Sequence, residues 1–136
     1  MNDKTIVEPR MSDVKEYRNF KDLAPMIMRK RLIIEGTTNQ SIHGFEIKNY
    51  LNELSKVMNM TIVSHPTIQW DDAYGYSGYV CWKESGSHMY SWTKTDERPN
   101  FFSVDIYTCK DFQVEDVIEF TKLHLKGNLR EITWRH

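Results

Sequence analysis

Two neighbouring stretches, WKESGSHMYSW at residues 82–92 and FFSVDIYTC at residues 101–109, decide the fold. In the second stretch, side chains alternate in the way expected of a strand that lays one face on a core. The first stretch places turn-forming residues at Ser85, Gly86 and Ser87. We therefore expect one strand to end at Lys83 and the next to run from His88 to Trp92.

The flanking segments complete an α+β pattern. Further strands are predicted at residues 30–36, 60–70, 77–83 and 129–134, with a turn at 37–39 and a loop at 71–76. Pro66 marks a sheet edge or a bulge. A first helix is predicted from apolar residues at helical spacing, namely Ile47, Tyr50, Leu51, Leu54, Val57 and Met58.

A second helix is predicted after Asp111, which is its expected N-cap, and Gly127 closes it. Its inner face comprises Val114, Val117, Ile118, Thr121 and Leu125. Long antiparallel hairpins with two helices on one face make a two-layer α+β sandwich. The other face of the sheet then needs a cover or a function, and a homodimer is one way to cover it.

The chain divides into an N-terminal extension at residues 1–28 and one domain at residues 29–136. The extension is predicted to be partly helical, with Ser12 capping a short helix to about Leu23. Val14, Tyr17 and Phe20 would lie on one side of that helix, and Pro25 would end it.

Composition narrows the class of function. Eighteen basic and 19 acidic residues give a formal net charge of -1, which argues against nucleic-acid binding. No apolar run is long enough to span a bilayer, so no membrane association is expected. Two cysteines, Cys81 and Cys109, fit a reducing cytoplasm. The five histidines show no metal-ligand spacing with cysteines or carboxylates, so no metal is expected.

A serine in a constrained turn can cleave its own chain. Its hydroxyl attacks the preceding carbonyl, the resulting ester eliminates, and hydrolysis leaves a pyruvoyl group. That ketone forms a Schiff base with a substrate amine and serves as an electron sink for decarboxylation. Taken alone, Glu84-Ser85-Gly86 is more often a plain turn, and Cys109 is more often a small buried hydrophobe.

The spacing of these residues resembles the small bacterial S-adenosylmethionine decarboxylases, which carry such a pyruvoyl group. Ser77-Gly78 opens the strand that leads to Glu84-Ser85, and Trp92 lies at the family's distance from Ser85. The segment from Asp105 to Cys109 matches the family's Asp-aliphatic-aromatic-Thr-Cys strand closely. More weakly, the order of elements matches from about Lys30 to Trp134.

The resemblance implies specific roles. Cleavage would fall between Glu84 and Ser85, and Ser85 would become the pyruvoyl cofactor. Cys109 would return a proton to the substrate carbon, and Ser77 would assist processing. The implied substrate is S-adenosylmethionine, a small molecule, and the implied pathway is cytoplasmic polyamine (spermidine) biosynthesis by an oligomeric enzyme.

Two positions depart from the family pattern. Gly86 stands where the family has a histidine after the serine, and Tyr90 stands where it has a second, processing histidine. A phenol is a poor base near neutral pH, and His88, on the same strand face, could substitute. Ser87-His88 is an alternative register for the Ser-His pair, although its distance to Trp92 is then two residues short.

The departures leave three functions open. The chain could decarboxylate S-adenosylmethionine, decarboxylate another amino acid such as arginine or ornithine, or bind a ligand without cleaving. Asp71-Asp72 is either a carboxylate pair for a cationic substrate or a solvated loop. Several aromatic side chains precede the proposed site at Ser85 in sequence, and an adenine could stack on one of them. They are Trp70, Tyr74, Tyr76 and Trp82.

Overall fold

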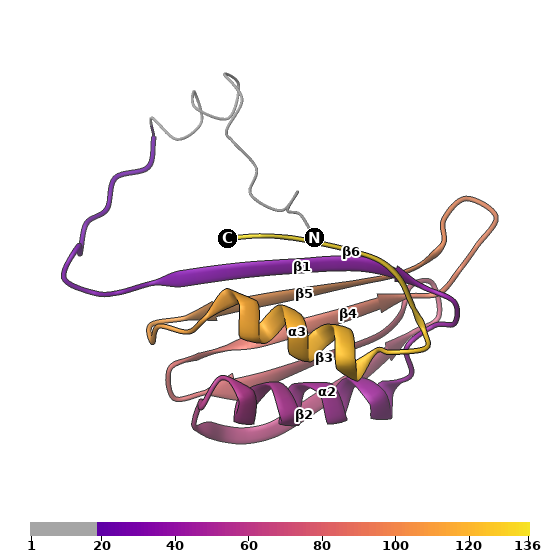
Figure 1. Ribbon diagram of the computed structural model, residues 1–136, viewed down its shortest axis with the longest axis horizontal. Coiled ribbons are helices and arrows are strands. Elements are labelled where there is room, and N and C mark those ends of the chain that lie inside the picture. The colour runs from indigo at the N-terminus through magenta and orange to yellow at the C-terminus, as the bar shows by residue number, and fades with distance from the viewer. Residues whose placement is uncertain (1–18) are drawn as a thin grey trace.

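The computed structural model describes residues 19–136, which form one sheet with two helices (Figure 1). The strands are β1 (Lys30–Thr38), β2 (Ile62–Asp71), β3 (Gly75–Trp82), β4 (Ser85–Trp92), β5 (Asn100–Thr108) and β6 (Leu129–Arg135). The helices are α2 (Gly44–Val57) and α3 (Val114–His124). Most of the helix predicted from Ser12 lies outside the described residues, and its described part, residues 19–23, is not helical.

All six strands pair antiparallel in the order β2-β3-β4-β5-β1-β6. β2 is an edge strand, and its register with β3 shifts between Ser64 and Thr67. Pro66 lies inside this irregularity, because it has no N–H to contribute to a regular ladder. The prediction of an edge or a bulge at Pro66 is confirmed.

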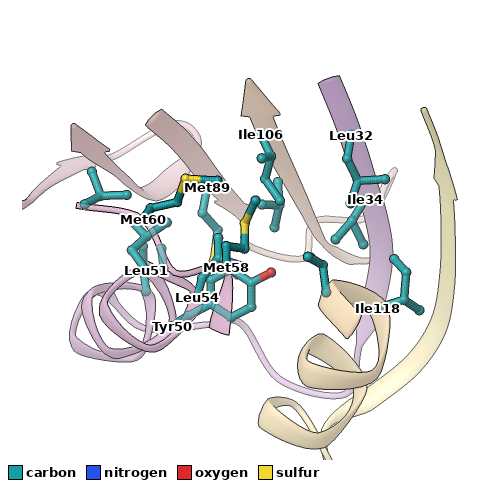
Figure 2. Packing of buried hydrophobic residues seen from close by; sticks show 14 of the residues in the cluster. Leu32, Ile34, Tyr50, Leu51, Leu54, Met58, Met60, Met89, Ile106 and Ile118 are labelled. Atoms are coloured by element: carbon teal, nitrogen blue, oxygen red, sulfur yellow. The ribbon is translucent and has the colours of Figure 1, made fainter. Parts of the chain in front are cut away.

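Both helices pack on the same face of the sheet, as Figure 1 shows. Alternate β5 residues, Phe102, Val104 and Ile106, are fully buried. They join Leu32 and Ile34 of β1 in one core cluster with residues of both helices (Figure 2). The two-layer α+β sandwich is confirmed, and the inner-face residues predicted for the two helices are buried, except Val57.

The turns differ from prediction in two places. β1 continues through Thr37 and Thr38, where a turn was expected, because both residues pair with β5. Ser85, Gly86 and Ser87 do not form the predicted connection but are the first residues of β4. The connection is a turn of only two residues, Lys83 and Glu84, because the ladder with β3 extends to the pair Trp82 and Ser85.

The prediction that Asp111 caps α3 is wrong. The N-cap is Gln113, which makes no side-chain capping hydrogen bond. Asp111 instead accepts from Lys30 Nζ at 2.9 Å and from the Phe112 N–H at 2.8 Å. The Lys30 ammonium holds the pKa of Asp111 below its usual value. Asp111 therefore ties the start of β1 to the loop before α3.

A buried hydrogen bond joins the two helices. Thr121 Oγ1 donates to the Val117 carbonyl at 2.8 Å, so the fully buried Tyr50 hydroxyl donates to Thr121 Oγ1, also at 2.8 Å. We expect Tyr50→Phe to lower the free energy of unfolding by about 1 kcal/mol. Thr121→Val should cost more, because the buried phenol then loses its acceptor. Urea denaturation measures both, and equal stability of all three proteins would contradict the assignment.

Candidate active site

The turn between β3 and β4 holds Ser85 in an unusual backbone conformation. Its φ is +132°, which a residue with a side chain rarely adopts. Such strain costs on the order of 1–3 kcal/mol and persists only where the surroundings impose it. Here two ladders impose it, since Ser85 pairs with Trp82 on one side and with Thr108 on the other.

The residue before Ser85 contacts the residue after β5. The Cys109 N–H donates to the Glu84 carbonyl oxygen at 2.9 Å. That carbonyl is the one a Ser85 hydroxyl would attack, and the amide donor polarises it and would stabilise negative charge on its oxygen. Cys109 itself is exposed. The fold thus brings Cys109 next to Glu84 and Ser85, although Cys109 follows Glu84 by 25 residues in the sequence.

The Glu84 carboxylate points to a different partner. It accepts from the Thr61 N–H at 2.9 Å and from the Thr61 hydroxyl at 3.2 Å. The backbone N–H of Thr61 is the main cause of a lowered pKa for Glu84. The side chain is therefore an ionised clamp that fixes the turn to the start of β2.

Ser77 and Tyr90 form a second group, at a distance from Ser85. They are direct ladder partners on β3 and β4. Tyr90 lies five residues after Ser85, which places it roughly 16 Å along the strand at about 3.3 Å per residue. His88 lies three residues after Ser85 and pairs with Tyr79 of β3 on one side and with Asp105 of β5 on the other. Within one chain, Ser77, His88 and Tyr90 therefore lie along the strands and not at the Ser85 turn.

An aromatic row crosses the sheet face that the helices leave uncovered. Its members are Tyr79, His88, Tyr90, Trp92 and Phe101, and successive ring centroids lie 4.3, 5.6, 5.7 and 5.4 Å apart. Sequence reasoning missed Tyr79 and Phe101 as members. Their alternation with buried neighbours on β3 and β5 places them on this face, but the pairing of strands is needed to align them.

A cavity of about 320 Å³ lies at the far end of β3 and β4. It is lined by Asp71, Tyr74, Gly75, Tyr76, Ser77, Tyr90, Ser91 and Trp92. Two of the four aromatic candidates, Tyr74 and Tyr76, therefore line this space. The Tyr74 side chain is exposed and could stack on a planar ligand, whereas the Tyr76 ring already packs against His43, with centroids 4.6 Å apart. Trp82 does not, because it is buried and its Nε1 donates to Ser55 Oγ at 2.7 Å. Trp70 packs on Tyr76, with ring centroids 4.7 Å apart.

Asp71 and Asp72 do not act as a carboxylate pair. Asp71 accepts from the Ala73 N–H at 2.8 Å and so stabilises the turn after β2. Asp72 accepts from Trp70 Nε1 at 2.7 Å. Of the two, only Asp71 lines the cavity.

Ser87, the alternative to Ser85, lies in a different environment. Its side chain is 1% exposed and faces the core from within the regular part of β4. Within the part of the chain that the structure describes, its Oγ has no hydrogen-bond partner. Ser87 has neither the positive φ nor the position at the turn that distinguish Ser85, so the geometry favours the register with Ser85.

His88 makes stability depend on pH. Partial burial lowers the pKa of His88 below its usual 6.5, against the opposing charge of Asp105. The unfolded chain then takes up this proton first, so stability present above pH 6.5 is lost as the pH falls through the folded-state pKa. We expect His88→Gln to reduce the loss of stability between pH 7.5 and pH 5. Thermal melts at both values measure it, and an unchanged difference would contradict this role.

The helices of the structure and the comparison with known proteins add three findings. No helix among residues 19–136 is long and apolar enough to cross a membrane. No curated protein matches the chain. The family model described as S-adenosylmethionine decarboxylase matches residues 43–134. That span includes the Ser85 turn, Cys109 and the aromatic cavity, and more than half of the chain. The chain therefore belongs to the S-adenosylmethionine decarboxylase family.

Proposed function

We propose that the chain cleaves itself between Glu84 and Ser85 and then decarboxylates S-adenosylmethionine in polyamine synthesis in the cytoplasm. The observation that carries the proposal is the geometry of the turn. Ser85 has a φ of +132°, and the carbonyl before it is bound by the Cys109 N–H. Strain at the reacting residue and a donor on the reacting carbonyl both favour an acyl shift.

The cleavage steps balance without an added reagent other than water. Ser85 Oγ bonds to the Glu84 carbonyl carbon, the carbon–nitrogen bond breaks, and the hydroxyl proton ends on the nitrogen. Elimination removes the Ser85 α-proton and breaks the bond from Cβ to the ester oxygen, which leaves Glu84 with a free carboxylate. Addition of water to the remaining enamine, as its imine, releases ammonia. Cleavage also removes the backbone constraint at Ser85.

The residues around the turn suit a pyruvoyl cofactor derived from Ser85. When present, the pyruvoyl ketone supplies the electron sink for loss of carbon dioxide. Cys109, exposed and held beside the turn through its own N–H, would carry at Sγ the proton that returns to the substrate carbon. Tyr74, whose exposed side chain lines the 320 Å³ cavity, would stack on an adenine there.

A homodimer through the uncovered sheet face would complete the site. Ser77 and Tyr90 line the cavity but lie too far from Ser85 to assist it in the same chain. If two sheets pack face to face about a two-fold axis, they sit about 10 Å apart, and the strand ends of one copy can meet the cavity of the other. The aromatic row supplies the apolar surface for that contact. Analytical sedimentation should give a molecular mass of twice 16.2 kDa. A monomeric mass at all protein concentrations would contradict the dimer.

The experiment that tests self-cleavage is a denaturing intact-mass spectrum of the purified protein. We expect two fragments, residues 1–84 and residues 85–136, with a pyruvoyl group at the start of the second. Fragments dividing before Ser87 would instead support the other register. Release of labelled carbon dioxide from S-adenosylmethionine then tests the substrate, with arginine and ornithine as the competing candidates.

A second candidate function is ligand binding without cleavage. It is favoured by the absence of an imidazole beside Ser85 within residues 19–136, since His88 lies three residues further along β4. In that case the intact-mass spectrum would show one chain of 16.2 kDa after long incubation. S-Adenosylmethionine should still quench the fluorescence of Trp92, which lines the cavity.

A further inference from the structure

The backbone at Gly86 runs too close to its neighbours to accept a side chain. A Cβ atom on Gly86 would lie 2.5 Å from the Val80 carbonyl oxygen and 2.7 Å from the Tyr79 hydroxyl oxygen. The first contact is with backbone, so a change of side-chain rotamer cannot relieve it. The histidine found at this position in the family pattern therefore does not fit this sheet without a shift of β3 or β4.

The space above Gly86 is taken by the phenol of Tyr79. Tyr79 lies on β3 directly opposite His88, and their ring centroids are 4.3 Å apart. The ring leans diagonally across the ladder, so that both Cζ and the hydroxyl lie over Gly86. The glycine at 86 and the tyrosine at 79 are thus a matched pair, in which one residue makes room for the other.

We propose that the Tyr79 hydroxyl donates a hydrogen bond to the carbonyl group formed at Ser85, in place of a side chain at residue 86. The inference rests on the proposed function, because that carbonyl exists only after cleavage. Gly86 is bonded directly to Ser85, so the hydroxyl that occupies the space of a residue 86 side chain is one residue away from the carbonyl formed at Ser85. A donor at the ketone oxygen makes its carbon more reactive toward an amine.

The state of the phenol suits this role. Burial, and after it the neighbouring Cys81 thiol, raises the pKa of Tyr79 above its usual 10. The hydroxyl is therefore protonated throughout the neutral range and remains a donor. His88 packs against the Tyr79 ring and in turn stacks on Tyr90, which restricts the movement of the phenol.

The test compares Tyr79→Phe with the wild type. Phenylalanine keeps the ring over Gly86, so the variant should fold, as circular dichroism will verify, and should cleave fully by intact mass. The rate at which phenylhydrazine captures the ketone, followed by absorbance, should fall about tenfold, the effect of losing one hydrogen bond. This readout does not depend on decarboxylation.

Tyr107→Phe is the matched control. Tyr107 is the ladder partner of Gly86 on β5, but its ring lies against the Arg31 guanidinium, 4.7 Å from the ring centroid. In the Tyr107→Phe variant, phenylhydrazine should capture the ketone at the wild-type rate.

Three outcomes would overturn the inference. If Tyr79→Phe is cleaved and its ketone reacts with phenylhydrazine at the wild-type rate, Tyr79 is not the donor, and the proposed function is unaffected. A folded Tyr79→Phe protein that no longer cleaves shows that the hydroxyl acts before the ketone exists. A wild-type chain that stays uncleaved overturns the proposed function and this inference together.

Discussion

Replacing Ser85 with alanine is expected to abolish both self-cleavage and decarboxylation. Alanine has no hydroxyl to attack the Glu84 carbonyl, so neither the ester nor the pyruvoyl group can form. Alanine is also subject to the same strain at a φ of +132°, so the fold should retain its stability within about 1 kcal/mol. A denaturing intact-mass spectrum should show a single chain, and release of carbon dioxide from S-adenosylmethionine should be undetectable.

The control for this variant is Ser87→Ala. Ser87 lies two residues further along β4, and its buried Oγ has no hydrogen-bond partner among the described residues. Removing that hydroxyl should leave cleavage unchanged and stability unchanged or slightly greater. If Ser85→Ala kept full decarboxylase activity, the proposed function would be refuted. If Ser87→Ala alone blocked cleavage, the register would move to Ser87.

Replacing Cys109 with alanine should separate cleavage from decarboxylation. The Cys109 N–H that binds the Glu84 carbonyl belongs to the backbone and remains in the variant. We therefore expect cleavage at the wild-type extent, while turnover falls by roughly 10²–10⁴-fold, the usual contribution of a positioned proton donor. Intact mass measures the first quantity, and the rate of product formation per cleaved chain measures the second.

Cys81→Ala controls for the general effect of losing a thiol. Cys81 is half-buried on β3, opposite Gly86, and has no proposed part in proton return. Its turnover should stay within a few-fold of the wild type. A Cys109→Ala protein with wild-type turnover would exclude the thiol as the proton donor. Loss of cleavage in this variant would instead show that its side chain acts earlier, in processing.

Much of the fold could be predicted because its signals are local. The helical spacing from Ile47 to Met58 and the alternation from Phe101 to Cys109 each depend on one element burying one face. Both predictions are confirmed, because the apolar face that each pattern defines is the face that lies in the core. The helix cap at Asp111 was mispredicted since its carboxylate has a stronger partner, Lys30, which is 81 residues away in sequence.

The candidate site was predicted only as a set of residues. The resemblance to the S-adenosylmethionine decarboxylases singled out Ser85, Cys109, Ser77 and Tyr90. It could not say that the first two meet and that the last two lie elsewhere, because this depends on the pairing of β4 with β3 and β5. A residue's neighbours across a sheet are set by register, which the sequence of either strand alone does not contain.

The amino-acid sequence by itself determined the two-layer class, the faces of its helices and the residue types available for chemistry. The tertiary structure alone decided the positive φ of Ser85, the Cys109 amide on the Glu84 carbonyl and the phenol of Tyr79 over Gly86. The physical reason is how far apart in sequence the interacting residues are. Periodicity reports what one segment buries, whereas strain and close approach arise only when three strands constrain the same turn.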